Sequence, residues 1–158
     1  MTPQAFDAVL KTPFGAIGVR TEGDAVAEIR FLPPGTPAQE ARSALARRTC
    51  MQLAAYLADP QAGFDLPLAP AGTPFQRRVW RAIAAIPEGR TLTYGEIAHR
   101  LKSAPRAVGQ ACGRNPYPVV VPCHRVVAAA GGLGGFASTR GGWLLDTKRW
   151  LLAHEQAL

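Results

Sequence analysis

Lysine is scarce in this sequence, and so are acidic side chains, paired cysteines and long apolar runs. Only Lys11, Lys102 and Lys148 are lysines, so arginine makes up most of a basic excess of 18 Lys and Arg over 11 Asp and Glu. An arginine-rich surplus is typical of a surface that faces phosphate groups. A genome rich in Arg, Ala, Gly and Pro codons would give the same composition, so the excess alone leaves both explanations open.

The cysteines exclude two classes of small protein. Cys50, Cys112 and Cys123 are odd in number and widely spaced, and no C-x-x-C occurs. This pattern fits neither a disulfide framework nor a zinc knuckle, so we expect no metal site and a reducing, cytoplasmic setting. Residues 1–10 lack a basic segment followed by an apolar core, which argues against a signal peptide. No apolar run approaches the ~20 residues of a membrane span, so we expect no membrane association.

The length and hydropathy predict a folded chain with two lobes. A chain of 158 residues that is 47% hydrophobic can bury a real core. Residues 61–72 are rich in proline and glycine and predict a linker. We therefore predict an N-terminal lobe over residues 1–71 and a C-terminal lobe over residues 72–158.

The first lobe is predicted to be a small antiparallel sheet followed by a helix. Apolar residues alternate over residues 6–32 with turn signals between them, which indicates a three-stranded meander. Thr36 then has the features of a helix cap, with Pro37 at the first helical position and Gln39 completing a capping box. The predicted helix ends at Asp59, before a proline.

The second lobe is predicted to be mainly helical, which makes the fold class α+β. Thr73 and Pro74 open one helix, Thr93 with Glu96 opens the next, and Ser103 caps a helix over residues 104–113. The last two helices are short and separated by a tight turn, as in a helix-turn-helix, although an ordinary helical hairpin has the same pattern. A final amphipathic helix is expected over residues 146–156.

The segment 115–127, NPYPVVVPCHRVV, holds the residues with the clearest chemistry. Residues 119–121 read as a short buried strand that ends at Pro122, which cannot donate to a ladder. Cys123 then lies at the end of a strand, where the chain geometry presents a side chain to a pocket. A thiolate is the nucleophilic form of cysteine, and imidazole or cationic neighbours such as His124 and Arg125 promote it. Taken alone, the motif fits a packing cysteine as well.

The order of several motifs resembles one family. The residues PCHRV at 122–126, preceded by Asn115 and Pro116, resemble the active-site signature of the O6-alkylguanine-DNA alkyltransferases. The likeness continues in TPFQRRVWRAI at 73–83, IPEGRTLTYGEIA at 86–98, RAVGQA at 106–111 and KRWLLAHE at 148–155. The resemblance implies a monomer that needs no cofactor. It would move an alkyl group from O6 of guanine, or from O4 of thymine, in double-stranded DNA onto Cys123, once per molecule.

The resemblance also implies roles for individual residues. His124 would contact Cys123 through a water, Glu155 would hold His124, and Asn115 would brace the turn. Tyr94 would crowd a DNA phosphate and donate a hydrogen bond to the purine. The helix that bears Arg106 would enter the minor groove, and the Arg106 side chain would fill the space that the flipped nucleotide leaves in the base stack. The implied DNA contacts are Tyr94, Arg106, Ala107, Gly109, Arg114 and Arg125. The implied pocket residues are Pro118, Val126, Phe136, Ala137 and Ser138.

Two stretches depart from the family pattern. Residues 136–139 read Phe-Ala-Ser-Thr where the family has an aromatic residue followed by Ser-Gly-Gly or Ala-Gly-Gly, and residues 140–144 look like an insertion. Two other functions stay open from the residues. One is a non-reactive sensor of alkylated guanine, which the cysteine at 123 argues against. The other is a cysteine hydrolase, which the adjacency of Cys123 and His124 argues against.

Overall fold

The computed structural model describes residues 5–129, 132–135 and 142–157, and these residues form two compact units. The first unit is Met1–Pro70 and the second is Ala71–Leu158. Within the first unit, β1 (Ala8–Thr12), β2 (Gly15–Glu22) and β3 (Ala25–Leu32) form an antiparallel sheet in the order β1-β2-β3. This confirms the predicted meander, and the fold class is α+β as expected.

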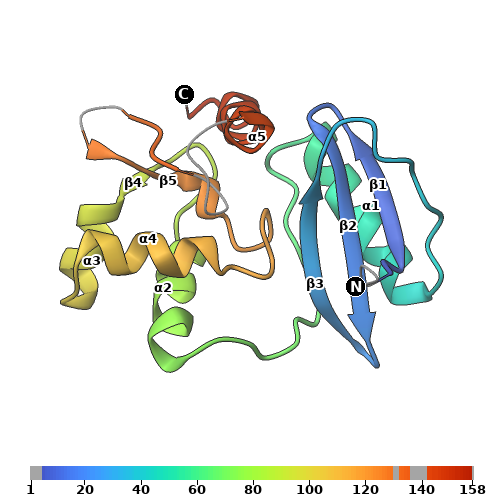
Figure 1. Ribbon diagram of the computed structural model, residues 1–158, viewed down its shortest axis with the longest axis horizontal. Helices are drawn as coiled ribbons and strands as arrows, with labels where there is room; N and C mark the ends of the chain where they lie inside the picture. The colour runs from blue at the N-terminus through green and yellow to red at the C-terminus, as the bar shows by residue number, and fades with distance from the viewer. Residues whose placement is uncertain (1–4, 130–131, 136–141, 158) are drawn as a thin grey trace. The chain divides into compact units, whose positions relative to one another are not determined.

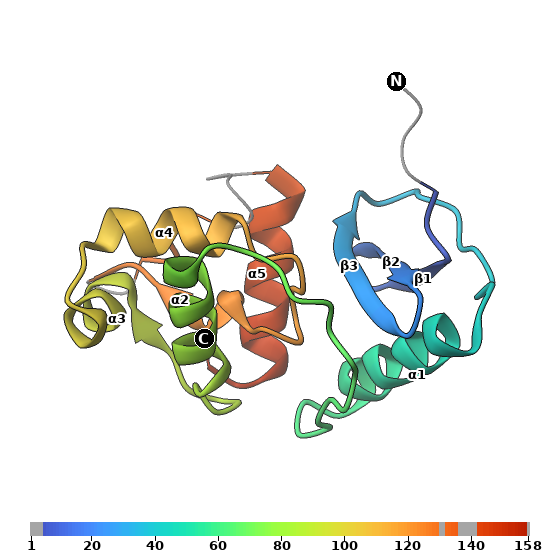
Figure 2. The same ribbon diagram turned by 90° about the horizontal axis from the view of Figure 1, so that it is seen from below.

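The helix α1 (Ala44–Ala58) lies against one face of this sheet (Figures 1 and 2). Its buried residues Ala46, Thr49, Leu53 and Tyr56 recur at helical spacing and pack on the apolar face of the strands. Asp59 ends the helix as predicted.

The predicted start of this helix was wrong. Thr36 does not cap it; its hydroxyl donates to the Pro33 carbonyl instead, at 2.7 Å. Gln39 exchanges both main-chain hydrogen bonds with Val9, at 3.0 Å each, which adds an extended segment beside β1. The helix begins only after Ser43, whose hydroxyl accepts from the Ala46 N–H. Pairing with the sheet thus outweighs a good local helix signal.

The second unit is mainly helical. It contains α2 (Pro74–Ala84), α3 (Tyr94–Leu101), α4 (Pro105–Gly113), the 3-10 helix η1 (Cys123–Arg125) and α5 (Gly142–His154). Two short strands, β4 (Leu92–Thr93) and β5 (Val126–Val127), pair in parallel. Because β4 runs into α3 and β5 follows η1, this pairing brings the start of α3 beside the chain that leaves η1 (Figure 1).

The capping signals of α2 and α3 are confirmed. Thr73 with Gln76, and Thr93 with Glu96, form complete capping boxes. Lys102, Ser103 and Ala104 join α3 to α4. Ser103 does not cap α4 as predicted, because the N-cap position is Ala104, which offers no side-chain hydrogen bond. The Ser103 N–H donates to the Ala98 carbonyl at the end of α3, at 2.9 Å.

Two further predictions in this unit are corrected. Residues 119–121 are a turn and not a strand: Val121 donates to the Tyr117 carbonyl at 2.8 Å, and Val119 has a left-handed φ of 73°. The final helix starts at Gly142 and not at residue 146, so residues 142–144 of the expected insertion form its first turn. Arg140 and Thr139 lie outside the described residues. Among the residues that are described, no helix is both long and apolar enough to span a bilayer.

Candidate active site

Asn115 organises the turn that carries the cysteine. Its Nδ2 donates to the Val121 carbonyl at 2.8 Å and to Cys123 Sγ at 3.2 Å, while its Oδ1 accepts from the Tyr117 N–H at 2.9 Å. One amide therefore ties both ends of the turn together. The donor on Sγ also favours negative charge on that sulfur.

Cys123 is the first residue of η1 and is only 5% exposed. A hydrogen bond with the Cys112 thiol and burial raise its pKa well above the ordinary thiol value, while Asn115 and the charge of Lys148 act in the opposite direction. The resting side chain is thus a neutral thiol. Nucleophilic attack by this sulfur requires a group that removes its proton.

His124 and Glu155 form a buried pair that can take up that proton. His124 Nε2 lies 2.7 Å from Glu155 Oε2, and both side chains are fully buried. Burial lowers the pKa of His124 below 6.5, and this effect exceeds the opposite one of Glu155. A neutral imidazole that donates from Nε2 has its free electron pair on Nδ1. That atom is buried and has no hydrogen-bond partner among the described residues.

Arg125 faces inward, and this corrects its predicted DNA contact. Its Nε and Nη2 donate to the Glu155 carboxylate at 2.8 and 3.1 Å, and its Nη1 donates to the Ile86 carbonyl at 2.7 Å. A bidentate guanidinium fixes the orientation of the carboxylate and neutralises its charge. The motif His-Arg at 124–125 therefore supplies two partners of one buried glutamate.

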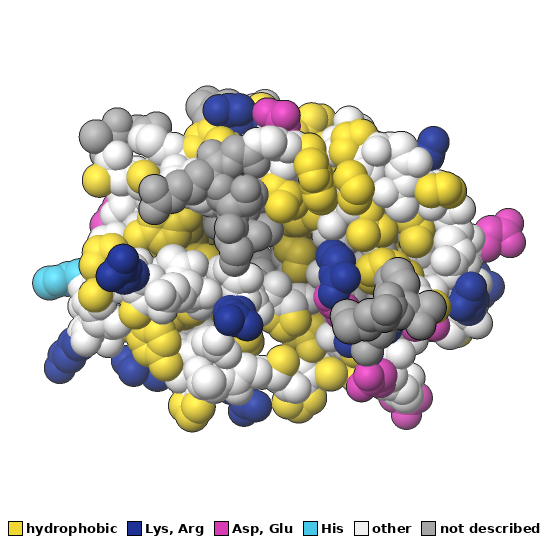
Figure 3. Space-filling view, in the orientation of Figure 1, with side chains coloured by type: hydrophobic (Ala, Val, Ile, Leu, Met, Phe, Trp, Pro, Cys, Tyr) yellow, Lys and Arg dark blue, Asp and Glu magenta, His cyan; other side chains and the backbone are white. Residues whose placement is uncertain are grey.

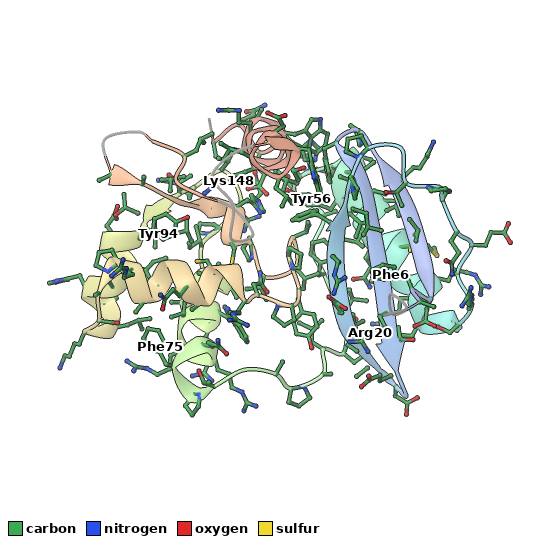
Figure 4. All side chains as sticks on the ribbon, in the orientation of Figure 1. Phe6, Arg20, Tyr56, Phe75, Tyr94 and Lys148 are labelled. Carbon is green, nitrogen blue, oxygen red and sulfur yellow. The ribbon has the colours of Figure 1, made fainter. Side chains whose placement is uncertain are left out.

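Tyr94 and Lys148 lie close to each other in the second unit (Figure 4). Tyr94 is the first residue of α3; its hydroxyl donates to the Gly135 carbonyl at 3.3 Å and lies 3.5 Å from Lys148 Nζ. Burial raises the pKa of Tyr94, so its phenol stays protonated. Gly134 packs against the ring with φ 72°, and a Cβ there would lie 2.8 Å from Tyr94 Cε2. Only glycine fits at that position.

Lys148 is a residue that the motif reading missed. It is fully buried, and its Nζ donates to the carbonyls of Val126, Leu133 and Gly135 at 2.7, 2.6 and 3.0 Å. Burial lowers its pKa to about 8. Helical periodicity could have found it, because positions 148, 151, 152 and 155 share one face of α5 with buried leucines and Glu155.

The predicted pocket residues are only partly described. Val126 is fully buried in β5, and Pro118 is half-buried and bridges to Val121. Phe136, Ala137 and Ser138 lie outside the described residues, so their predicted role stays a prediction. No group of three or more His, Cys, Asp or Glu side chains that could hold a metal ion occurs in the described part of the chain.

The helix α4 and its C-cap carry four of the six predicted DNA contacts. Arg106 and Arg114 are exposed near its two ends, and Ala107 and Gly109 are half-buried between them. Residues 71–158 carry 12 Lys and Arg against 4 Asp and Glu, whereas residues 1–70 carry 6 against 7, so the net charge of +7 comes entirely from the second unit. Figure 3 shows several of these basic side chains spread over α2, α3 and α4. Such a surface favours a polyanion.

Comparison with known proteins identifies the family. The family model described as "6-O-methylguanine DNA methyltransferase, DNA binding domain" matches residues 74–157, which is more than half of the chain. The chain belongs to the O6-methylguanine-DNA methyltransferase family. The family resemblance of the motifs at 73–83, 86–98 and 122–126 is thereby confirmed.

Members of this family from other organisms align over most of the chain. A methylated-DNA–protein-cysteine methyltransferase of Methanosarcina mazei is 49% identical over 112 residues, which is 70% of this chain and 68% of that protein. One from Mycolicibacterium paratuberculosis is 51% identical over 107 residues, 66% of this chain and 62% of that protein. The structure of Mycobacterium tuberculosis OGT in complex with DNA has a TM-score of 0.79 at 36% identity, covering 94% of this chain and 91% of the other.

The buried histidine of this family member gives a testable pH dependence. Because the pKa of folded His124 lies below 6.5, unfolding takes up a proton as the pH falls below 6.5, and the free energy of unfolding decreases there. The slope from one such group is at most about 1.4 kcal/mol per pH unit. All three tryptophans lie in residues 71–158, so urea unfolding of this unit can be followed by tryptophan fluorescence above and below pH 6.5.

The variant His124→Gln is expected to lose this part of the slope. His99→Gln is the matched control, since His99 is exposed on α3 and its loss leaves the buried pair intact. If the free energy of unfolding changes with pH by the same slope in the unchanged protein and in His124→Gln, the assignment of a neutral imidazole to His124 is wrong.

Proposed function

We propose that this protein repairs alkylated DNA by moving the alkyl group from O6 of guanine to Sγ of Cys123, acting once per molecule as a monomer. The observation that carries the proposal is the buried Cys123 beside a His124–Glu155 pair whose Nδ1 has no described partner. The DNA-repair relatives and the basic surface of the second unit support it.

The proposed reaction begins with the transfer of the thiol proton to His124 Nδ1 through a water molecule, while Glu155 stabilises the imidazolium. The thiolate attacks the alkyl carbon, the bond from that carbon to O6 breaks, and its electron pair stays with the purine. The protonated phenol of Tyr94 is placed to donate a hydrogen bond to the purine as charge develops. A thioether is a stable product, so Cys123 is not regenerated.

The target guanine has to leave the helix stack before it can reach a buried sulfur. We propose that α4 enters the minor groove, where Ala107 and Gly109 allow close approach and Arg114 contacts the phosphate backbone. Arg106 would fill the space that the flipped nucleotide leaves. Pro118 and Val126, with Phe136, Ala137 and Ser138, would line the pocket that receives the base. Minor-groove recognition predicts little dependence on the surrounding DNA sequence.

Intact-protein mass spectrometry tests the proposal. The protein is mixed with excess duplex DNA that contains one O6-methylguanine. We expect one added methyl group that maps to Cys123 and an equal amount of DNA converted to guanine. Tight, lesion-selective binding with no change in protein mass would contradict the proposal and favour the sensor. Continued conversion beyond one equivalent would also contradict it.

Arg106→Ala is expected to weaken binding to the lesion duplex by about 10- to 100-fold, because flipping a base costs a few kcal/mol and this side chain offsets part of that cost. Binding to unmodified duplex should weaken much less. Arg100→Ala is the matched control, since it removes one exposed charge from α3. It should weaken both duplexes equally and lower the salt dependence. Equal losses on both duplexes for Arg106→Ala would remove its proposed role in flipping.

A further inference from the structure

Gln110 lies in the middle of the α4 face that is proposed to meet DNA. It is exposed, one turn after Arg106 and one turn before Arg114, so the three side chains share one face of the helix. The sequence of α4 is PRAVGQACG, and the residues that surround Gln110 in it are small or apolar. Between the two arginines, Gln110 is therefore the one long polar side chain that could reach a base edge.

Gln110 also lines a hollow of about 590 Å³ between α4 and the first turn of α2, two helices that pack against each other (Figure 1). Arg114 lines the same hollow from the end of α4, and Phe75 and Gln76 line it from α2. The Oε1 atom of Gln76 is already engaged, because it accepts from the Thr73 N–H at 2.9 Å in the capping box. The amide of Gln110 has no hydrogen-bond partner in the part of the chain that the structure describes, so it is available to a ligand.

The two ends of this amide differ in what the minor groove can offer them. Close approach of α4 would exclude water from the amide, and a polar group that loses water without gaining a partner costs free energy. Every base pair presents an acceptor in the minor groove, N3 of a purine or O2 of a pyrimidine, but only G·C presents a donor, the guanine 2-amino group. The Nε2 atom of Gln110 can therefore donate at any base pair, whereas its Oε1 finds a donor only at G·C. Glutamine is one of the side chains with which minor-groove proteins separate A·T from G·C.

We propose that Gln110 is a specificity-determining residue that favours a G·C over an A·T base pair at one position beside the target guanine. The proposal rests on the part of the proposed function that places α4 in the minor groove. Gln110 is four residues from Arg106, which is about 6 Å along a helix axis. With α4 along the groove, this distance corresponds to about two base-pair steps from the flipped nucleotide. The preference is confined to that pair, because the neighbouring side chains of α4 are small and Arg114 is assigned to phosphate.

Base analogues test the contact with the 2-amino group directly. Inosine is guanine without this group, and 2,6-diaminopurine is adenine with it, so each analogue changes the minor groove and leaves the major groove as it was. Duplexes with one O6-methylguanine carry G·C, inosine·C, A·T or 2,6-diaminopurine·T at one flanking position at a time, and their affinities are measured. We expect one position at which the G·C and 2,6-diaminopurine·T duplexes bind about 3- to 10-fold tighter than the other two, which is the scale of one hydrogen bond.

Three variants assign the preference to one side chain. Gln110→Leu has a side chain of similar size without an amide, so the four duplexes should bind it with equal affinity. Gln61→Leu is the matched control and should keep the preference, since Gln61 is exposed in the first unit. Arg114→Ala should weaken all four duplexes equally and keep their order, because a phosphate contact carries no sequence information. Equal binding of the four duplexes by the unchanged protein would overturn the proposal, as would a preference that persists in Gln110→Leu.

Methyl transfer on the same duplexes separates this proposal from the proposed function. One methyl group on Cys123 with equal affinity for the four duplexes would overturn the role of Gln110 and leave alkyl transfer in place. A preference for the 2-amino group without any added methyl group would overturn alkyl transfer and leave Gln110 in contact with the minor groove.

Discussion

Cys123→Ser is expected to lower the rate of alkyl transfer by about 10⁴-fold or more, which is the scale of removing a catalytic nucleophile. Serine is close in size to cysteine and can still accept the Asn115 Nδ2 hydrogen bond, so the turn keeps its shape. Its hydroxyl is a far weaker nucleophile than a thiolate and ionises at much higher pH. The loss is therefore expected in chemistry and not in binding.

Two measurements separate these effects. Intact mass after incubation with O6-methylguanine duplex should show no methyl group on Cys123→Ser, while affinity for the same duplex should stay within about threefold of the unchanged protein, a difference of less than 1 kcal/mol. Cys50→Ser should accept one methyl group at the unchanged rate. A methylated Cys123→Ser protein would place the acceptor elsewhere.

Glu155→Gln is expected to have the second-largest effect, because Glu155 accepts from both His124 and Arg125 in a site that is closed to solvent. Removing one partner of a buried ion pair typically costs about 3–5 kcal/mol, since the other charge stays buried without compensation. An amide oriented by Arg125 is also a poor acceptor for an imidazolium. We therefore expect alkyl transfer to slow by about 10²–10⁴-fold, the usual contribution of general base catalysis.

The expected losses of stability and rate for Glu155→Gln can be separated with a second change. The double variant Glu155→Gln with Arg125→Met no longer has the unpaired charge of Arg125. Much of the lost free energy of unfolding should therefore return in urea unfolding, while the single-turnover rate of alkyl transfer should stay low. Asp146→Asn on the same helix is the control, because its ion pair with Arg149 is exposed and worth less than about 1 kcal/mol. Recovery of the rate in the double variant would show that Glu155 acts on stability alone.

The fold was predictable where short-range signals and long-range pairing agree. The capping boxes at Thr73 and Thr93 lie next to the helices they start, and the alternation over residues 6–32 matches a sheet that pairs with itself. The same signal at Thr36 was misleading, because Gln39 gains two hydrogen bonds to Val9 from β1, far away in the sequence. The three consecutive valines after Pro118 favour a strand, yet among the described residues their segment has no ladder partner beyond its own Pro118–Val121 bridge.

The residues of the candidate site were predictable from the family motifs, but the hydrogen bonds and ion pairs between them were only partly predictable. The structure joins Glu155 to His124 and Asn115 to Cys123, while the water-mediated contact between His124 and Cys123 stays a prediction. Arg125 was named among the DNA contacts, but it pairs with Glu155, which lies too far away in the sequence for a pattern to connect the two residues. Helical periodicity places Lys148 on the buried face of α5, but its main-chain carbonyl partners could not be predicted, since they leave no trace in residue types.

The bonds of Lys148 bear on how this protein can change in evolution. Three main-chain carbonyls, those of Val126, Leu133 and Gly135, accept from its Nζ, and main-chain carbonyls are present whatever side chain a residue carries. Substitutions at Val126 or Leu133 can therefore change the side chains of this segment without removing its hydrogen bonds to Lys148. One amine on α5 thus holds the facing segment through atoms that every residue type supplies, so the side chains of that segment can change without loss of these three hydrogen bonds.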